Sequence, residues 1–194
     1  MIGATATGMT GIYLVRHGEA DYDAIQRRRW PGKLADLAPL TPLGFEQANA
    51  AGEQLAGVGA AKLLSSPFTR TMQTASAVSC RVGLAIDVEL DLHEWLPDDT
   101  FSWHDVADVR ALVADFDSCG GEWPPGERRV WEPLSSVRRR AAATLRRAAD
   151  SVAGQGSLIA VCHEMVIRSV TGVVKTRYGQ VRYIDSTELP VGMR

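Results

Sequence analysis

The stretch GIYLVRHGEA, residues 11–20, carries the signal from which the fold is predicted. Its first half, Gly11–Val15, is short and apolar and contains β-branched residues, a pattern typical of a buried strand. Arg16, His17 and Gly18 follow at once. A buried strand that ends on an arginine and a histidine indicates either an ordinary polar turn or a site built to hold an anion.

Similar apolar runs recur along the chain and predict further strands. These runs are Ala61–Ser65, Leu84–Val88 and Ser157–Cys162, and a last strand is expected within residues 181–189. Helices are expected between them, because Thr41-Pro42 and Ser66-Pro67 each place an N-cap residue before a proline. The expected helices cover residues 42–58, 67–78, 106–116, 134–152 and 164–173.

Strands that alternate with helices predict an α/β fold. We expect a three-layer α/β/α sandwich with a mostly parallel central sheet. Residues 1–194 are expected to form a single domain. Within it, residues 21–41 are polar and irregular in pattern, and residues 92–132 are expected to be an insertion over the sheet with at most short helices.

The composition excludes several classes of partner. The 21 Lys and Arg residues nearly balance the 23 Asp and Glu residues, for a net charge of −2. This balance indicates neither nucleic acid nor an anionic membrane as partner, so any anion site must be local. No apolar run reaches the length of a membrane-spanning helix, and the first residues lack the pattern of a signal peptide. The 3 cysteines are scattered, which predicts reduced thiols and a cytoplasmic location.

Polar residues follow each predicted parallel strand at its carboxyl end, where open α/β sheets bind ligands. Arg16 and His17 follow the first strand, Arg70 comes shortly after the second, Glu94 follows the third and His163 follows the fourth. Arginine presents a planar fork of donors to phosphate oxygens. Neutral histidine can act as a nucleophile or carry a proton. The convergence of these residues predicts a site for a phosphoryl group.

The motifs RHGEA, SSPFTRTMQTA, LHEW and VCHEMVIR, in this order, resemble those of the histidine phosphatase superfamily, the phosphoglycerate mutase-like group. LTPLGFEQA also resembles the helix start that follows the first motif in that family. The resemblance covers roughly residues 11–173. It implies a metal-independent enzyme without a cofactor that acts on a small phosphorylated metabolite.

The resemblance also implies a role for each matched residue. His17 would be the nucleophile that becomes phosphohistidine, and Glu94 would be the general acid and then the base. The phosphoryl oxygens would be bound by Arg16, Arg70, His163 and Gly18. For His17 to attack, its other nitrogen should donate to a backbone carbonyl, for which Gly18 is the candidate.

Each of these residues also has a simpler interpretation. His17 and His163 are weighed against histidines that merely end a strand, and Glu94 against nearby surface carboxylates. A cation such as Arg70 in the first turn of a helix opposes the helix dipole, which favours an anionic partner. The arginines of residues 134–152 are interpreted as a solvated helix face. Core packing is the default for the tryptophans, and Trp95 and Trp103 are also candidates for a pocket wall.

Some positions depart from the family pattern. Ala20 and Asp23 stand where many members have Thr and Asn, and Glu164 stands where Gly is usual. These departures favour a phosphatase that hydrolyses a small phosphomonoester through a phosphohistidine. The alternatives are a phosphoglycerate mutase-type phosphotransferase, a protein phosphohistidine phosphatase, and a catalytically silent binding module. Specificity is expected in residues 21–40 and 92–132, and the oligomeric state has no signal in the sequence.

Overall fold

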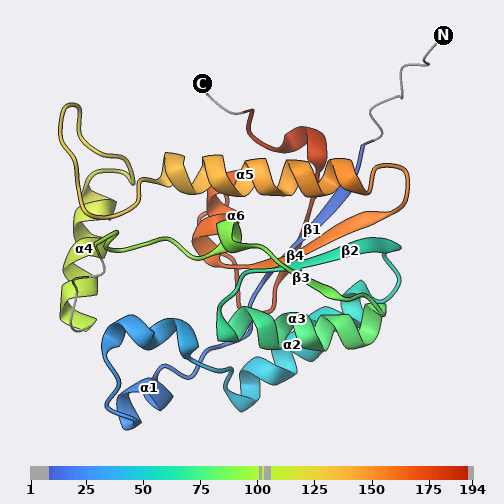
Figure 1. The fold of residues 1–194 in the computed structure, drawn as a ribbon, viewed down its shortest axis with the longest axis horizontal. Coiled ribbons are helices and arrows are strands. Elements are labelled where there is room, and N and C mark those ends of the chain that lie inside the picture. Colours follow the sequence, from blue (N-terminus) through green and yellow to red (C-terminus); the bar gives the residue numbers. More distant parts are fainter. Residues whose placement is uncertain (1–8, 101, 103–105, 192–194) are drawn as a thin grey trace.

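The computed structural model describes residues 9–100, 102 and 106–191. Its centre is a five-stranded sheet in the order β3-β2-β4-β1-β5, as Figure 1 shows. The strands are β1 (Gly11–Arg16), β2 (Ala60–Ser65), β3 (Ile86–Val88), β4 (Ser157–Cys162) and β5 (Val181–Asp185). β4 pairs in parallel with both β1 and β2, and β3 is parallel to β2. Only β5, at the edge beside β1, is antiparallel, so the prediction of a mostly parallel sheet is confirmed.

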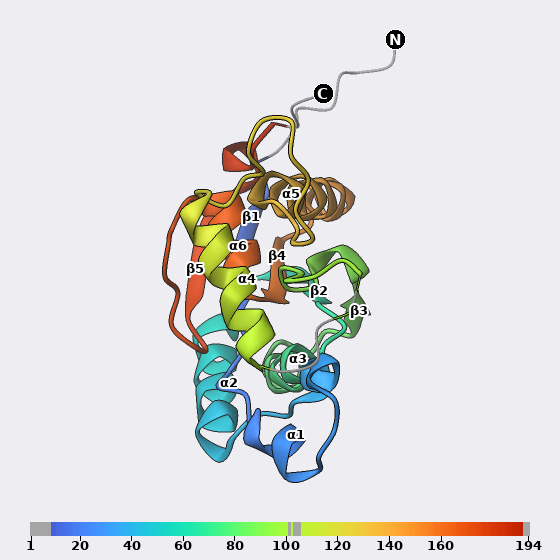
Figure 2. The same cartoon turned by 90° about the vertical axis from the view of Figure 1, so that its left-hand side faces the viewer.

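Helices cover both faces of the sheet and complete the three predicted layers. α2 (Pro42–Leu55) and α3 (Thr69–Val82) lie on one face, and α5 (Leu134–Ser151) and α6 (Glu164–Thr171) lie on the other, as Figures 1 and 2 show. Alternate residues of a strand face opposite layers. Leu14 packs in the cluster that contains α5 and α6, whereas Val15 packs in the cluster that contains α2 and α3. β1 is therefore apolar from Gly11 to Val15 because both of its faces are covered.

The two predicted cap-plus-proline helix starts have different outcomes. Thr41 caps α2 as predicted, since its hydroxyl accepts from the Gly44 amide at 2.9 Å. The predicted start at Ser66-Pro67 is wrong, because α3 begins at Thr69 after an extended Phe68 that makes no side-chain cap. The Ser66 hydroxyl lies instead against the His163 ring, at 2.8 Å. A tertiary contact has taken the side chain that the local pattern assigned to capping.

Several boundaries differ from those predicted. α2 ends at Leu55, the strand expected over residues 84–88 is only Ile86–Val88, and α6 ends at Thr171, before Gly172 in the left-handed conformation. The strand expected within 181–189 ends at Asp185, whose carboxylate caps the short 3-10 helix Ser186–Glu188. Residues 21–41 are also more regular than predicted. They contain α1 (Asp23–Arg27) and a 3-10 helix, η1 (Gly32–Leu37), both too short for an apolar period to develop.

The segment predicted as an insertion carries one helix, α4 (Val106–Ser118), close to the expected position. Figures 1 and 2 show α4 at the same end of the molecule as α1. A small apolar cluster of Phe116, Trp131 and Leu134 joins the segment to the start of α5, with Trp95 packed against it. Core packing is thus confirmed for Trp131, while Trp103 lies outside the described residues.

Candidate functional site

The parallel pairing of β1, β2 and β4 brings polar side chains to one sheet edge. The His17 amide donates to the Cys162 carbonyl at 3.1 Å, and the Ser66 amide donates to the Val161 carbonyl at 3.0 Å. The rings of His17 and His163 therefore lie with their centroids 5.2 Å apart, and both are buried. Cys162 points into the core beneath them, where burial raises the pKa of its thiol, as expected for a packing residue.

His17 is held as a neutral imidazole with one nitrogen fixed. Its Nδ1 lies 2.6 Å from the Gly18 carbonyl, which can only accept, so Nδ1 carries the proton, as predicted. Nε2 then presents its lone pair, and the Arg70 Nε donates to it at 3.3 Å. Burial, and then the charge of Arg70, lowers the pKa of His17 to about 3. The unprotonated Nε2 is therefore uncharged and able to attack, and it lies beside a guanidinium that can bind an anion.

The backbone of Gly18 is committed within the protein. Its carbonyl holds His17, and its amide donates to the Thr74 hydroxyl on α3 at 3.1 Å. A Cβ at Gly18 would lie only 2.2 Å from the Gly44 carbonyl oxygen at the start of α2, so only glycine fits this close approach. We therefore assign Gly18 to orienting His17, and the expectation that it contacts the phosphoryl group receives no support from this arrangement.

Burial of His17 predicts a pH dependence of stability. Its pKa is about 3 in the fold against 6.5 for an ordinary histidine, so the unfolded chain takes up the proton first as the pH falls. This group therefore lowers the free energy of unfolding progressively from pH 6.5 toward pH 3 and has no effect above 6.5. We expect His17→Gln, which takes up no proton, to lose about 2 kcal/mol less stability than wild type between about pH 7 and pH 5. Urea unfolding at both pH values measures this, and equal losses would contradict it.

His163 has one nitrogen free for a ligand. Its Nε2 lies 2.8 Å from the Ser66 hydroxyl, and its buried Nδ1 has no hydrogen-bond partner among the described residues. Burial, and then Arg70, lowers the pKa of this ring as well. When the Ser66 hydroxyl donates to Nε2, the neutral ring carries its proton on Nδ1, and this tautomer can donate a hydrogen bond at the sheet edge beside His17.

The two arginines of the site are already neighboured by carboxylates. The Arg70 guanidinium is buried beside the Phe68 ring, and its Nη1 lies 3.6 Å from the half-exposed Asp36 carboxylate. The Arg16 Nη1 lies 3.1 Å from the carboxylate of Glu164, the position at which the family pattern has Gly. Part of the positive charge is thus balanced within the protein, while the Arg16 Nε and the Arg70 Nη1 have no hydrogen-bond partner among the described residues.

Glu94 lies in the wall of a cavity of about 480 Å³ that adjoins this cluster, and Arg70 lines the same cavity. The Glu94 Oε1 accepts from the Trp95 amide at 2.9 Å. Burial raises the pKa of this carboxyl, against the opposing effects of that hydrogen bond and of Arg70. A carboxyl that keeps its proton to a higher pH than an ordinary glutamate, beside a guanidinium, suits a general acid.

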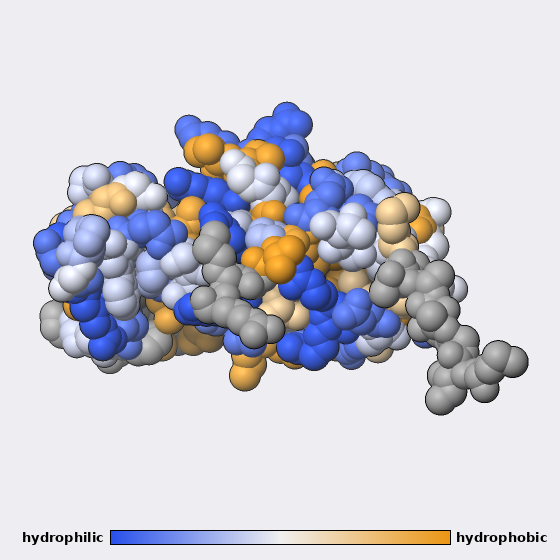
Figure 3. Space-filling view, turned by 90° about the horizontal axis from the view of Figure 1, so that it is seen from above, coloured by the Kyte–Doolittle hydropathy of each residue, from blue (hydrophilic) through white to orange (hydrophobic). Residues whose placement is uncertain are grey.

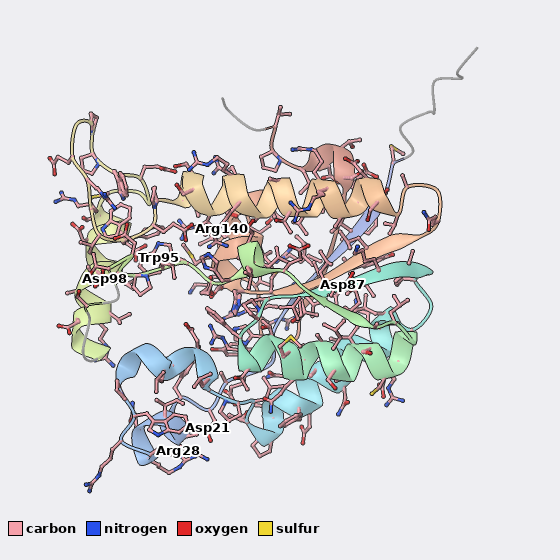
Figure 4. The ribbon with its side chains drawn as sticks, in the orientation of Figure 1. Asp21, Arg28, Asp87, Trp95, Asp98 and Arg140 are labelled. Carbon is pink, nitrogen blue, oxygen red and sulfur yellow. The ribbon has the colours of Figure 1, made fainter. Side chains whose placement is uncertain are left out.

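Arg140 holds the Glu94 loop, which corrects the interpretation of the α5 arginines as a solvated face. Figure 3 looks onto α5 and shows hydrophilic residues interspersed with apolar ones. Arg140, however, lies beneath α5 beside Trp95, as Figure 4 shows, and its side chain is 13% exposed. It donates to the carbonyls of Asp91 at 2.7 Å and His93 at 2.8 Å, and it forms two hydrogen bonds with the Glu132 carboxylate. The loop that carries Glu94 is therefore anchored by a side chain of α5.

This anchor predicts a large loss of stability in Arg140→Met. The substitution leaves the Glu132 carboxylate, whose side chain is 12% exposed, without its cation, and the free energy of unfolding is expected to fall by about 3 kcal/mol. Arg139→Met is the matched control, since Arg139 is exposed and donates only to the Ser136 hydroxyl on its own helix. Urea unfolding of both variants measures the difference, and similar values would show that Arg140 anchors nothing.

Sequence patterns missed Tyr178, whose place in the site has no local signal. Tyr178, in the loop before β5, places its ring 4.1 Å from the Arg16 guanidinium and 5.6 Å from the His17 ring. Glu19 orients its loop, because its carboxylate accepts from the Thr41 hydroxyl at 2.8 Å. Asp23 is exposed as the first residue of α1 and does not line the cavity.

Two further findings concern ligand and membrane sites. Within residues 9–100, 102 and 106–191, no group of three or more His, Cys, Asp or Glu side chains is placed to hold a metal ion. Nor does this part of the chain contain a helix of the length and apolar character needed to cross a bilayer. The three cysteines are all free.

Comparison with known structures supports the fold. A mycobacterial glucosyl-3-phosphoglycerate phosphatase in complex with VO3 superposes with a TM-score of 0.68 over 90% of each chain, at 21% identity. A putative alpha-ribazole-5'-P phosphatase from Escherichia coli K-12 gives 0.65 over 91% of this chain and 90% of the other, also at 21% identity. At such low identities these similarities establish the architecture alone.

Comparison of sequences supports the family. The probable phosphoglycerate mutase GpmB of Salmonella paratyphi C is 37% identical over 86 residues, which are 44% of this chain and 38% of the relative. That of Proteus mirabilis is 33% identical over 84 residues, 42% of this chain and 37% of the relative. The chain thus matches less than two fifths of the length of these curated relatives. The family description "Histidine phosphatase superfamily (branch 1)" matches residues 12–185, from β1 to the end of β5. With that match over nearly the whole chain, the protein belongs to the histidine phosphatase superfamily.

Proposed function

We propose that this protein hydrolyses a small-molecule phosphomonoester through a phosphohistidine on His17. The observation that carries the proposal is the state of His17: neutral, with Nδ1 held by the Gly18 carbonyl and Nε2 facing the Arg70 guanidinium. A structural histidine at a strand end has no need of a buried guanidinium that donates to its unprotonated nitrogen.

In the first step, the His17 Nε2 attacks the phosphorus atom and the bond from phosphorus to the ester oxygen breaks. Arg16, Arg70 and the Nδ1–H of His163 bind the phosphoryl oxygens and balance their charge. The carboxylic acid of Glu94 gives its proton to the departing alkoxide, so an alcohol leaves. The products of this step are the alcohol, a phosphohistidine and the Glu94 carboxylate.

In the second step, the Glu94 carboxylate takes a proton from a water molecule, whose oxygen attacks the phosphohistidine. The bond between Nε2 and phosphorus breaks, and inorganic phosphate leaves. His17 is restored as the neutral imidazole and Glu94 as the acid, so the cycle closes. No group beyond these side chains is required, and we propose that the enzyme is independent of metals and cofactors; full activity in EDTA is the expected result.

The residues around Arg16 and Arg70 favour hydrolysis over mutase action. Glu164 gives Arg16 a permanent carboxylate partner, and Ala20 and Asp23 replace the residues usual in mutases. A phosphoglycerate mutase-type phosphotransferase is the second candidate, and the names of the curated relatives favour it. The same site would then return the phosphoryl group to an organic acceptor in place of water.

Product analysis separates these candidates. We expect stoichiometric inorganic phosphate from phosphomonoesters and no exchange between 2- and 3-phosphoglycerate. Isomerisation faster than phosphate release would establish the mutase. Dephosphorylation of a phosphohistidine protein that outpaces every small ester would establish a protein phosphohistidine phosphatase. Binding of esters without either product would leave the silent binding module.

The remaining proposals concern organisation and location. We propose that residues 1–194 form a single domain and that residues 92–132 cover the site, which is supported by the contribution of Glu94–Asp98 and Val109 to the cavity wall. A cytoplasmic location is supported by the free cysteines. Limited proteolysis that leaves one resistant fragment, and fractionation of cells, test these two points.

A further inference from the structure

We infer that the substrate is a monoester of an apolar, preferably aromatic alcohol that carries no second anionic group. The inference rests on the proposed phosphatase function, because it concerns the part of the substrate that leaves as the alcohol. It is carried by the cavity that Arg70 and Glu94 line and by the charges in the wall of that cavity.

The cavity is shaped and lined for an apolar group. Its volume of about 480 Å³ lies within the range usual for small-molecule sites. Arg70 and Glu94 both lie in its wall, so a phosphoryl group at Arg70 directs the alcohol past Glu94 into the remaining space. That space is bounded by aromatic rings and aliphatic side chains, among them Tyr22, Ile25, Trp30, Phe68, Trp95 and Val109.

The charges of the wall disfavour a second anion. Among the described lining residues, Arg70 is the one that carries a positive charge, and it belongs to the phosphoryl end. The other ionisable lining groups are the carboxyl groups of Asp36, which faces Arg70, of Glu94, which is protonated at the start of the first step, and of Asp98. A carboxylate on the alcohol would lose its hydration, and the described lining residues offer it no cation beyond Arg70.

The arginines of residues 27–29 do not supply the missing cation. The Arg27 guanidinium is exposed and binds the Asp21 carboxylate at 2.7 Å. Arg28 donates to the Ala24 carbonyl at 2.9 Å and lies 5.7 Å from the Trp30 ring. Figure 4 shows Arg28 and Asp21 together at α1, and none of the three arginines lines the cavity. Their positions argue against any of them holding a second anionic group of the substrate.

Two matched pairs of esters test the inference. 2-Phenylethyl phosphate and ethyl phosphate share a primary alkoxide leaving group and differ in the ring, so kcat/KM should be about ten- to hundredfold higher for the first. 4-(Carbamoylmethyl)phenyl and 4-(carboxymethyl)phenyl phosphate have nearly the same shape and differ in one charge. We expect the neutral ester to be favoured by about tenfold or more.

A charge introduced into the wall should reverse the second preference. Gln26 is exposed on α1 and lines the cavity, and Gln26→Arg places a cation there. The ratio of kcat/KM for the carboxylate over the neutral ester should rise about tenfold in this variant. Gln54→Arg is the control for net charge, since Gln54 is exposed near the end of α2 away from the site.

The outcomes separate the inference from the function on which it rests. Equal kcat/KM within either pair, or a preference for the carboxylate ester in the wild type, would overturn the inference and leave the phosphatase intact. An equal rise of the ratio of kcat/KM for the carboxylate over the neutral ester in Gln26→Arg and Gln54→Arg would show that charge in the cavity wall does not determine the preference. Absence of phosphate release from every ester would remove the proposed function, and the inference with it.

Discussion

His17→Ala is expected to lower kcat for p-nitrophenyl phosphate by on the order of 10⁴-fold or more and to abolish the phosphoenzyme. The reason is that the Nε2 of His17 is the attacking atom in the proposed cycle, and Arg70 and His163 have nothing to stabilise without a transferred group. Base-quenched protein analysed by mass spectrometry should show one added phosphoryl group at His17 in wild type. It should show none in the variant.

His93→Ala is the matched control, because it removes another imidazole near the same sheet edge. The His93 Nδ1 donates to the Glu94 carbonyl at 2.7 Å, and among the described residues the ring makes no hydrogen bond to His17, Arg70 or His163. This variant should still form the phosphohistidine. A phosphoenzyme that persists in His17→Ala, or that maps to another residue, would remove His17 from the role of nucleophile.

Glu94→Gln is expected to slow alkyl phosphomonoesters by on the order of 10²–10⁴-fold and p-nitrophenyl phosphate by less than about tenfold. An alkoxide needs a proton in order to leave, whereas p-nitrophenolate leaves without one. Gln fills the same space but has no proton to give at this position. The measurement is kcat for a series of esters that differ in the basicity of the leaving group.

The pH profile gives an independent test of the same assignment. Because burial raises the pKa of Glu94, its acid form persists above the usual range of glutamate, and wild-type activity on alkyl esters should fall as the pH rises through that raised pKa. Glu94→Gln should lose this alkaline limb. Asp91→Asn is the control, since Asp91 is an exposed carboxylate on the preceding 3-10 helix, η2 (Leu90–Leu92). Equal losses on both ester classes, or the same pH profile in both variants, would contradict a general acid at Glu94.

Much of the fold was readable from the sequence, because local patterns record burial. β1 up to Val15 and β4 after Ser157 are apolar since helices cover both faces of the sheet, and this produced the short runs from which they were predicted. Thr41 and Pro42 marked the start of α2 because a cap and a fixed φ act within a single turn. Such signals weaken where elements are short, so α1 and η1 were missed.

The sequence by itself determined the cluster at the sheet edge. Arg16 ends β1, His17 and His163 directly follow β1 and β4, and Arg70 lies in the first turn of the helix after β2. In a parallel sheet the carboxyl ends of neighbouring strands lie together, so order along the chain was sufficient to predict proximity in space. The protonation state of His17 was predicted on the same basis, because the Gly18 carbonyl is its immediate neighbour.

Only the tertiary structure decided what surrounds that cluster. In the sequence, Arg140 belongs to the polar face of the helix predicted over residues 134–152, which is typical of a surface arginine. Its partners, Asp91, His93 and Glu132, lie outside this helix. Ser66 reads as a helix cap, and Glu164 as a first-turn acid. Ser66 instead contacts His163, and Glu164 instead binds Arg16, both of which lie far away along the chain. The hydrogen-bond partner of such a polar side chain cannot be predicted from the local sequence, because the packing of the layers decides which donor and acceptor meet.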